Sequence, residues 1–144
     1  MKGFFGKNDF LLQGITKKGK PASCVSCGLG KTAKTKNMEP YGQFKKEIML
    51  VGDIPCDYSD EKGKPWQGTD GRFLQNTLYK MGIDIFKDCV TINAINCAKP
   101  YDEAPTDHEM SCCLTKVREK IAKYNPKVIF LLGDIAVKQL IGDR

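Results

Sequence analysis

Three short apolar runs are the clearest pattern along the chain. They cover residues 48–52, 89–94 and 127–133, and within them apolar residues are grouped rather than alternating with polar ones. Such runs are typical of strands that are buried on both faces of a parallel sheet. The sequence therefore predicts three parallel strands.

The segments between and after these runs have the periodicity of helices. Apolar residues recur at helical spacing over residues 70–81, and a second stripe lies between a capping box at Thr106 and a stop at Asn125. A last short helix is expected over residues 135–141. Strands that alternate with helices through right-handed crossovers predict an α/β fold, with a three-layer α/β/α core around a short parallel sheet.

Residues 1–47 have no sustained apolar period and are predicted to be an irregular segment. They hold ten lysines against three acidic residues, whereas the rest of the chain holds 13 basic residues and 14 acidic ones. The positive charge is thus concentrated in one segment, which favours binding to phosphates. The alternative is a solvated lysine-rich arm that has no partner. The candidate contact residues are Lys17, Lys18, Lys20, Lys31, Lys34 and Lys36.

Four of the seven cysteines are spaced like the ligands of a metal centre. Cys24 and Cys27 form a C-x-x-C pair, Cys97 follows the second predicted strand, and Cys113 lies in a predicted helix. An all-sulfur site suits zinc or an iron-sulfur cluster. An odd number of cysteines also argues against a closed disulfide framework.

Helical phase separates the two adjacent cysteines in the predicted helix. With about 100° per residue, Cys113 lies roughly 60–70° from the centre of the apolar stripe, and Cys112 lies almost opposite that centre. Cys113 is therefore predicted to face inward, and Cys112 to face solvent or the margin of the buried surface.

Polar residues stand where the predicted strands end. Asp53 follows the first strand, Asn93 ends the second, and Asp134 follows the third. Ligands of open parallel sheets bind beyond the carboxyl ends of the strands, so Asp53 and Asn93 are expected to share one cleft. The alternatives are that Asp53 caps a loop and that Asn93 satisfies backbone at the strand end.

No run reaches the ~18 consecutive apolar residues that a membrane span requires. The first residues also lack the apolar stretch of a signal peptide. We therefore expect a cytoplasmic, monomeric protein with one domain over residues 1–144. Residues 1–47 would form its basic segment and residues 48–144 its α/β core.

Four stretches resemble the motifs of one family: residues 52–56 (GDIPC), 63–74 (GKPWQGTDGRFL), 91–97 (TINAINC) and 126–133 (PKVIFLLG). In order and spacing they resemble the iron-sulfur uracil-DNA glycosylases, the family 4 branch of their superfamily. The resemblance covers residues 24–142, the amino-terminal two-thirds of a family domain. It implies either a fragment of a longer protein or a shortened, phage-like form with one uncovered sheet edge.

The resemblance also implies a cofactor. Cys24, Cys27, Cys97 and Cys113 match the cysteines that hold a [4Fe–4S] cluster in the family. Such a cluster would tie the basic amino-terminal segment to the core. Zinc remains the alternative metal.

The resemblance further implies a base-flipping mechanism on uracil-containing DNA, which includes single-stranded DNA. Asp53 would polarise water or stabilise a cationic sugar, Asn93 would read the uracil edge, and Trp66 would stack on the base. Gly52, Ile54 and Pro55 belong to the same motif and would contact the substrate.

The family's carboxy-terminal histidine motif has no counterpart in this sequence, whose only histidine is His108. Two functions are therefore weighed. The first is uracil excision. The second is a non-catalytic iron-sulfur DNA-binding module of a larger replication protein, such as a phage DNA polymerase, with further domains as partners. A phage-encoded protein would act in the host cytoplasm.

Overall fold

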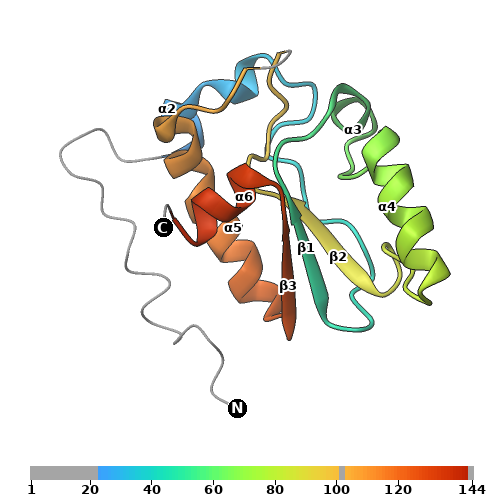
Figure 1. Ribbon diagram of the computed structural model, residues 1–144. Coiled ribbons are helices and arrows are strands. Elements are labelled where there is room, and N and C mark those ends of the chain that lie inside the picture. Colours follow the sequence, from blue (N-terminus) through green and yellow to red (C-terminus); the bar gives the residue numbers. More distant parts are fainter. Residues whose placement is uncertain (1–22, 101–102, 143–144) are drawn as a thin grey trace.

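The predicted strands form one parallel sheet in the order β2-β1-β3 (Figure 1). The computed structural model describes residues 23–100 and 103–142. Its strands are β1 (Ile48–Gly52), β2 (Cys89–Asn93) and β3 (Val128–Leu132). Gly52 pairs with Asn93 on one side and with Leu132 on the other, so the three carboxyl ends lie at one edge. The predicted parallel α/β fold is confirmed.

Six helical segments accompany the sheet in the described part of the chain. They are α2 (Cys24–Cys27), the 3-10 helix η1 (Leu29–Lys31), α3 (Asp57–Lys62), α4 (Thr69–Lys80), α5 (Asp107–Tyr124) and α6 (Asp134–Leu140). The helices predicted from periodicity correspond to α4, α5 and α6. No described helix combines the length and apolar character that a bilayer crossing requires.

The short helix α3 is not predicted by apolar periodicity. Its first turn contains Asp57 and Asp60, and its carboxyl end is Gly63 in the left-handed conformation with φ 69°. Acidic residues in the first turn and a glycine after the last turn favour a helix there. These end signals, rather than an apolar stripe, were the available evidence for α3.

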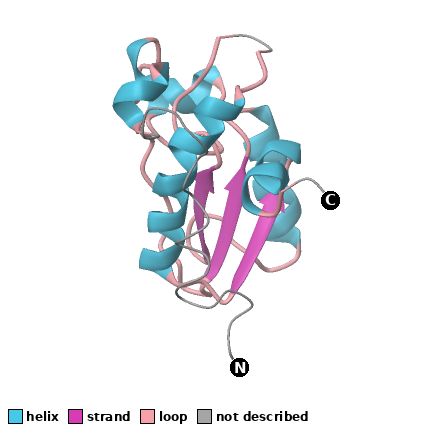
Figure 2. Cartoon of the chain, turned by 90° about the vertical axis from the view of Figure 1, so that its left-hand side faces the viewer, coloured by secondary structure: helices cyan, strands magenta, loops and turns pink. Residues whose placement is uncertain are grey.

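Helices cover both faces of the sheet (Figure 2). On one face, Met49 and Val51 of β1 pack with Val117 of α5 and Ala136 of α6. On the other face, the cluster around Leu50 includes apolar side chains of α4. Alternate residues of each strand therefore enter different hydrophobic clusters, which is how a strand is buried on both faces.

The two outer edges of the sheet differ. The edge of β2 is covered by the amino-terminal segment, because Tyr41 and Thr91 exchange backbone hydrogen bonds of 3.0 and 2.8 Å. Strand β3 pairs only with β1 among the described residues, and Val128 and Phe130 are 45% and 50% exposed. The expectation of one uncovered edge is confirmed for the described part of the chain.

The prediction for the adjacent cysteines of α5 is half right. Cys113 is buried, as predicted, with 6% of its surface exposed. The prediction that Cys112 faces solvent or the margin is wrong, since Cys112 is 2% exposed. Helix α2 covers this side of α5, and the Ser26 hydroxyl lies 3.6 Å from the Cys112 sulfur. Helical phase alone could not show that a second layer covers the polar side of the helix.

Met49 provides a test of the core. Its side chain is fully buried between the sheet and the helices, so we expect Met49→Ala to lower the free energy of unfolding by about 2–5 kcal/mol. Met81→Ala is the control, because Met81 is 70% exposed and its loss should change stability by less than about 0.5 kcal/mol. Urea unfolding followed by circular dichroism measures both. Equal losses in the two variants would contradict this core.

Candidate functional site

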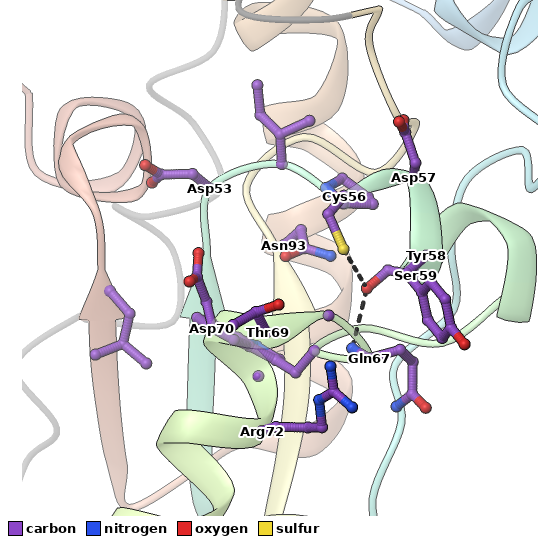
Figure 3. Close-up of a pocket in the computed structure, with 16 residues that line it drawn as sticks. Asp53, Cys56, Asp57, Tyr58, Ser59, Gln67, Thr69, Asp70, Arg72 and Asn93 are labelled. Atoms are coloured by element: carbon purple, nitrogen blue, oxygen red, sulfur yellow. Dashed lines mark hydrogen bonds between the residues drawn. The ribbon is translucent and has the colours of Figure 1, made fainter.

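A cavity of about 580 Å³ opens where β1 and β2 end. Its walls come from the loop after β1, the start of α3, the loop before α4, the start of α4 and the ends of β2 and β3 (Figure 3). Five of the six active-site residues predicted from sequence line it: Asp53, Ile54, Pro55, Trp66 and Asn93. The sixth, Gly52, lies against Trp66 and Asn93. The sheet thus brings together residues that stand far apart in the sequence.

Gly52 allows a close approach between Trp66 and Asn93. A Cβ atom at position 52 would lie 2.6 Å from Cζ2 of the indole and 2.9 Å from Oδ1 of Asn93. Both distances are shorter than van der Waals contact, so a larger residue would displace one side chain or the other. The glycine at the end of β1 is therefore part of the site.

Trp66 is held in an uncommon backbone conformation. Its φ is 59°, in the left-handed region, and the Gln75 side chain donates to its carbonyl oxygen at 3.2 Å. Left-handed backbone at a bulky residue costs on the order of 1–3 kcal/mol, and such strain is concentrated at functional sites. The indole Nε1 is buried without a hydrogen-bond acceptor among the described residues. The loop before α4 thus holds the Trp66 indole beside Gly52 at the cost of a strained backbone conformation.

Asn93 lies near the centre of the group of side chains that line the cavity (Figure 3). Its side chain is buried, and its Nδ2 donates to the sulfur of Met38 at 3.9 Å. Thioether sulfur is a weak acceptor, so this contact leaves most of the carboxamide's hydrogen-bonding capacity unused. A buried amide of this kind is suited to pair with a ligand that offers a donor and an acceptor side by side.

The carboxylate of Asp53 turns toward α6 (Figure 3). Its Oδ1 accepts a hydrogen bond of 2.8 Å from the amide of Ala136 in the first turn of α6. Gly133 makes this possible, because its φ is 128° and a Cβ there would lie 2.2 Å from Oδ2 of Asp53. Burial raises the pKa of Asp53, the Ala136 amide opposes that shift, and the nearby charge of Asp134 adds to it. The alternative weighed from the sequence is that Asp53 caps a loop, whereas the observed contact joins it to the first turn of helix α6.

Cys56 belongs to a small hydrogen-bonded group on the opposite wall. Its sulfur donates to the hydroxyl of buried Ser59 at 3.4 Å, and the same hydroxyl accepts from the amide of Gln67 at 3.1 Å (Figure 3). This group joins α3 to the loop that carries Trp66. Sequence reasoning missed Ser59 and Gln67, since no motif assigned either residue a role and their contact depends on how α3 folds.

The cavity carries an excess of negative charge. Asp53, Asp57 and Asp70 line it together with one cationic side chain, Arg72. Three carboxylates repel a phosphate group, whereas a neutral polar heterocycle meets no such opposition. The charges therefore favour a neutral ligand in the cavity itself.

A second cavity, of about 340 Å³, is lined by all four cysteines predicted as metal ligands. Cys24 and Cys27 come from α2, Cys97 from the loop after β2, and Cys113 from α5. Cys112, which is buried between α2 and α5, also lines this cavity. The structure thus brings the predicted cysteines together around one space.

Backbone amides point at three of these sulfurs. The amide of Asn37 donates to Cys97 at 3.3 Å, and the amides of Leu29 and Asn96 donate to Cys27 and Cys113. Burial raises the pKa of Cys27, and it raises the pKa of Cys113 to about 11, while these amides act in the opposite direction. The free thiols of Cys27 and Cys113 are therefore protonated at neutral pH, and a metal that binds them must displace their protons.

Two features bear on which metal group these residues fit. Buried side-chain atoms without partners, Asn37 Oδ1 and Asn96 Nδ2, belong to residues that line the cavity. Within the described ranges, no three Cys, His, Asp or Glu side chains are grouped closely enough to hold a single ion. Four thiols around one space, with backbone amides directed at three of the sulfurs, are a donor set that suits an all-sulfur metal group.

Ile54 links the two cavities. It lines the cavity of Asp53 and Asn93, and it packs against the hydrophobic cluster that contains Cys27, Cys97 and Cys113. The thiol-lined cavity therefore supports one wall of the candidate active site.

The candidate phosphate-binding lysines have different surroundings. Lys31 and Lys36 are exposed beside the thiol-lined cavity. Lys34 forms an exposed ion pair of 2.8 Å with Glu61. Lys17, Lys18 and Lys20 lie outside the described residues.

Residues 39–143 match the sequence model of the uracil DNA glycosylase superfamily. The chain belongs to this superfamily. It is 32% identical over 123 residues to the type-4 uracil-DNA glycosylase of Pyrobaculum aerophilum, and 33% identical over 116 residues to that of Archaeoglobus fulgidus. These matches cover 83% and 81% of the chain. The resemblance inferred from the four motifs is confirmed.

The chain spans 60% and 57% of the length of these two glycosylases. It also resembles a DNA polymerase of Bacillus phage SP01, with 28% identity over 105 residues. That match covers 73% of the chain and 11% of the polymerase. The matched superfamily region contains the whole Asp53 and Asn93 cavity and ends beyond α6.

Gly52→Ala tests the close approach of Trp66 and Asn93 to the backbone at Gly52. The added methyl group should displace the indole of Trp66, and because Trp66 is the only tryptophan, its fluorescence reports the change directly. We expect a shifted emission maximum. Gly30→Ala is the control, since its Cβ would lie no closer than 3.7 Å to a neighbour. A Gly52→Ala spectrum identical to that of the wild type would contradict the close approach.

Proposed function

We propose that this chain binds uracil-containing DNA, takes a flipped-out uracil into the cavity of Asp53 and Asn93, and hydrolyses its N-glycosidic bond. The observation that carries the proposal is the meeting of Trp66 and Asn93 at Gly52, in a cavity with no excess of positive charge. Membership of the uracil DNA glycosylase superfamily supports it. A base in a duplex must leave the stack before an enzyme reaches its glycosidic bond.

Uracil has the features that this cavity accommodates. Its edge offers N–H and carbonyl groups side by side, which the donor and acceptor of the Asn93 carboxamide can pair with. Its ring is flat and can stack on the indole of Trp66. Because Asn93 is buried, a base that leaves the amide unpaired is penalised more heavily than it would be in water.

Asp53 is the proposed catalytic carboxylate. As the bond between C1′ and the base breaks, its electrons pass to the uracil ring and positive charge develops on the sugar. A water oxygen then forms the new bond to C1′, and a carboxylate can stabilise the cation and accept the water proton. The amide of Ala136 orients the Asp53 carboxylate, which would therefore act from the wall beside α6.

The proposed cofactor is a [4Fe–4S] cluster on Cys24, Cys27, Cys97 and Cys113, with zinc as the alternative. The four thiols around one cavity and the amide donors to Cys27, Cys97 and Cys113 support the cluster. When bound, it would supply a structural crosslink, since base excision transfers no electrons. These ligands would fix α2 against α5, and Ile54 would carry that rigidity to the active-site wall.

The DNA backbone is proposed to contact the lysine-rich segment. Lys31 and Lys36 are exposed near α2 and are the best-placed described members. Lys34 would have to exchange its ion pair with Glu61 for a phosphate, which costs little at an exposed site. Lys17, Lys18 and Lys20 remain proposed contacts on sequence grounds alone.

A second candidate function is a non-catalytic DNA-binding module of a larger replication protein. The bond between Asp53 and the Ala136 amide favours it, because this carboxylate already has a structural partner. The partial match to a phage DNA polymerase is consistent with it. The two functions share DNA binding and differ in bond cleavage.

Excision is measured on end-labelled, uracil-containing single-stranded DNA, followed by alkaline cleavage at abasic sites. We expect the wild type to release uracil and Asn93→Ala to lower the rate by about 100-fold or more, because a buried hydrogen-bonding amide is lost. Asn76→Ala, at an exposed position on α4, should retain the wild-type rate.

Binding without cleavage by the wild type would reject the enzyme and leave the DNA-binding module. No binding to uracil-containing DNA would reject both functions. Asp53→Asn separates the roles of the carboxylate: a lost rate with retained binding supports catalysis, and an unchanged rate contradicts it.

The cluster is tested by colour and iron content. Purified protein should be brown, with broad visible absorption, and Cys113→Ser should lose most of its iron because a buried ligand is removed. Cys112→Ser is the matched control at the next position and should keep its iron. Colourless wild-type protein with bound zinc would reject the iron-sulfur assignment.

A further inference from the structure

Lys120 is a buried cation on α5. Only 7% of its surface is exposed, and its Nζ donates to the carbonyl oxygen of Met38 and to Oδ1 of Asn96, both at 2.8 Å. Among the described residues it forms no ion pair with a carboxylate. Burial lowers the pKa of Lys120, and the nearby charge of Glu39 opposes that shift without forming an ion pair with it. Burying an ammonium group whose hydrogen-bond acceptors are neutral oxygens is unfavourable, so the fold bears a cost that requires an explanation.

Lys120 lies on the same helix as Cys113, which lines the thiol-lined cavity. It follows Cys113 by seven residues, which is two helical turns and places both residues on the same face of α5. Long side chains on a helix lean toward its amino terminus, which here is the direction of Cys113. The Lys120 ammonium therefore lies on the same side of α5 as Cys113, in contact with Met38 and Asn96.

The two hydrogen bonds of Lys120 hold the backbone that faces the sulfurs. The side-chain oxygen of Asn96 accepts from Lys120, and the backbone amide of Asn96 donates to the sulfur of Cys113. Met38, whose carbonyl it binds, follows Asn37, and the amide of Asn37 donates to Cys97. One cation therefore contacts both segments that supply amide donors to these two sulfurs.

The orientation of the Asn96 carboxamide follows from the same contact. An ammonium group has no acceptor, so the amide must present its oxygen to Lys120. Its Nδ2 is then left buried without a partner among the described residues, in a side chain that is 2% exposed and belongs to the cavity lining. A buried, unused donor at this cavity is consistent with a sulfur-rich acceptor inside it.

We propose that Lys120 is a positioning residue of the iron-sulfur site, where its buried ammonium offsets the negative charge of the thiolate-bound cluster and fixes the amide donors to Cys97 and Cys113. Four thiolates give such a cluster net negative charge, and a low-dielectric surrounding makes a nearby cation effective. This inference rests on the proposed cluster and is independent of uracil excision.

The test is the midpoint reduction potential of the iron-loaded protein, followed by visible absorption and electron paramagnetic resonance. Lys120→Met removes the charge and keeps the length of the side chain. Because reduction adds negative charge, loss of the cation should shift the potential to a more negative value, and iron loss to a chelator should become several-fold faster. Lys123→Met, at an exposed position on the same helix, should change neither quantity.

Asn96→Asp is the second variant and keeps nearly the same shape. It places a carboxylate against the Lys120 ammonium, so it should shift the potential in the same direction even if Lys120→Met fails to fold. Potentials of Lys120→Met and Asn96→Asp equal to that of the wild type would overturn the proposal. Wild-type protein without iron would also overturn it, whereas the excision assay would still decide the proposed activity separately.

Discussion

The parallel pairing of β1 with β2 is the constraint on which both candidate sites depend. The ladder ends at the Gly52 and Asn93 pair, and two further hydrogen bonds continue it, from Ala94 to Gly52 at 2.7 Å and from Ile95 to Asp53 at 2.9 Å. This register places Asn93 beside the loop that carries Asp53. A slip of one residue would turn Asn93 to the opposite face and remove it from the cavity.

The same short connection that follows Asn93 also reaches the thiol-lined cavity. Ile95 is fully buried in the cluster that contains Cys113, and Cys97 lines the second cavity two residues later. The cavity of Asp53 and Asn93 and the thiol-lined cavity are therefore joined by one short connection. A crosslink at Cys97 would limit the motion of Asn93, so the proposed cluster would influence the geometry of the proposed base-binding site.

Sequence patterns predicted the features that depend on local order. Apolar runs predicted the three strands, and the rule that ligands bind at carboxyl strand ends predicted that Asp53 and Asn93 share one cleft, as they do. Features that depend on layers packed from distant segments could not be predicted. Burial of Cys112 requires α2 to cover α5, and the contact of Lys120 with Asn96 joins residues 24 positions apart through a loop without periodicity. The orientation of Asp53 likewise depends on where α6 begins.

The central claim is that Gly52, Trp66 and Asn93 form a uracil-binding cavity at the end of β1 and β2. Titration of the iron-loaded protein with free uracil, followed by the fluorescence of its single tryptophan, tests that claim most directly. The account predicts saturable quenching of Trp66 that is lost in Asn93→Ala. Fluorescence that does not change with uracil, or that changes equally in the wild type and in Asn93→Ala, would contradict it.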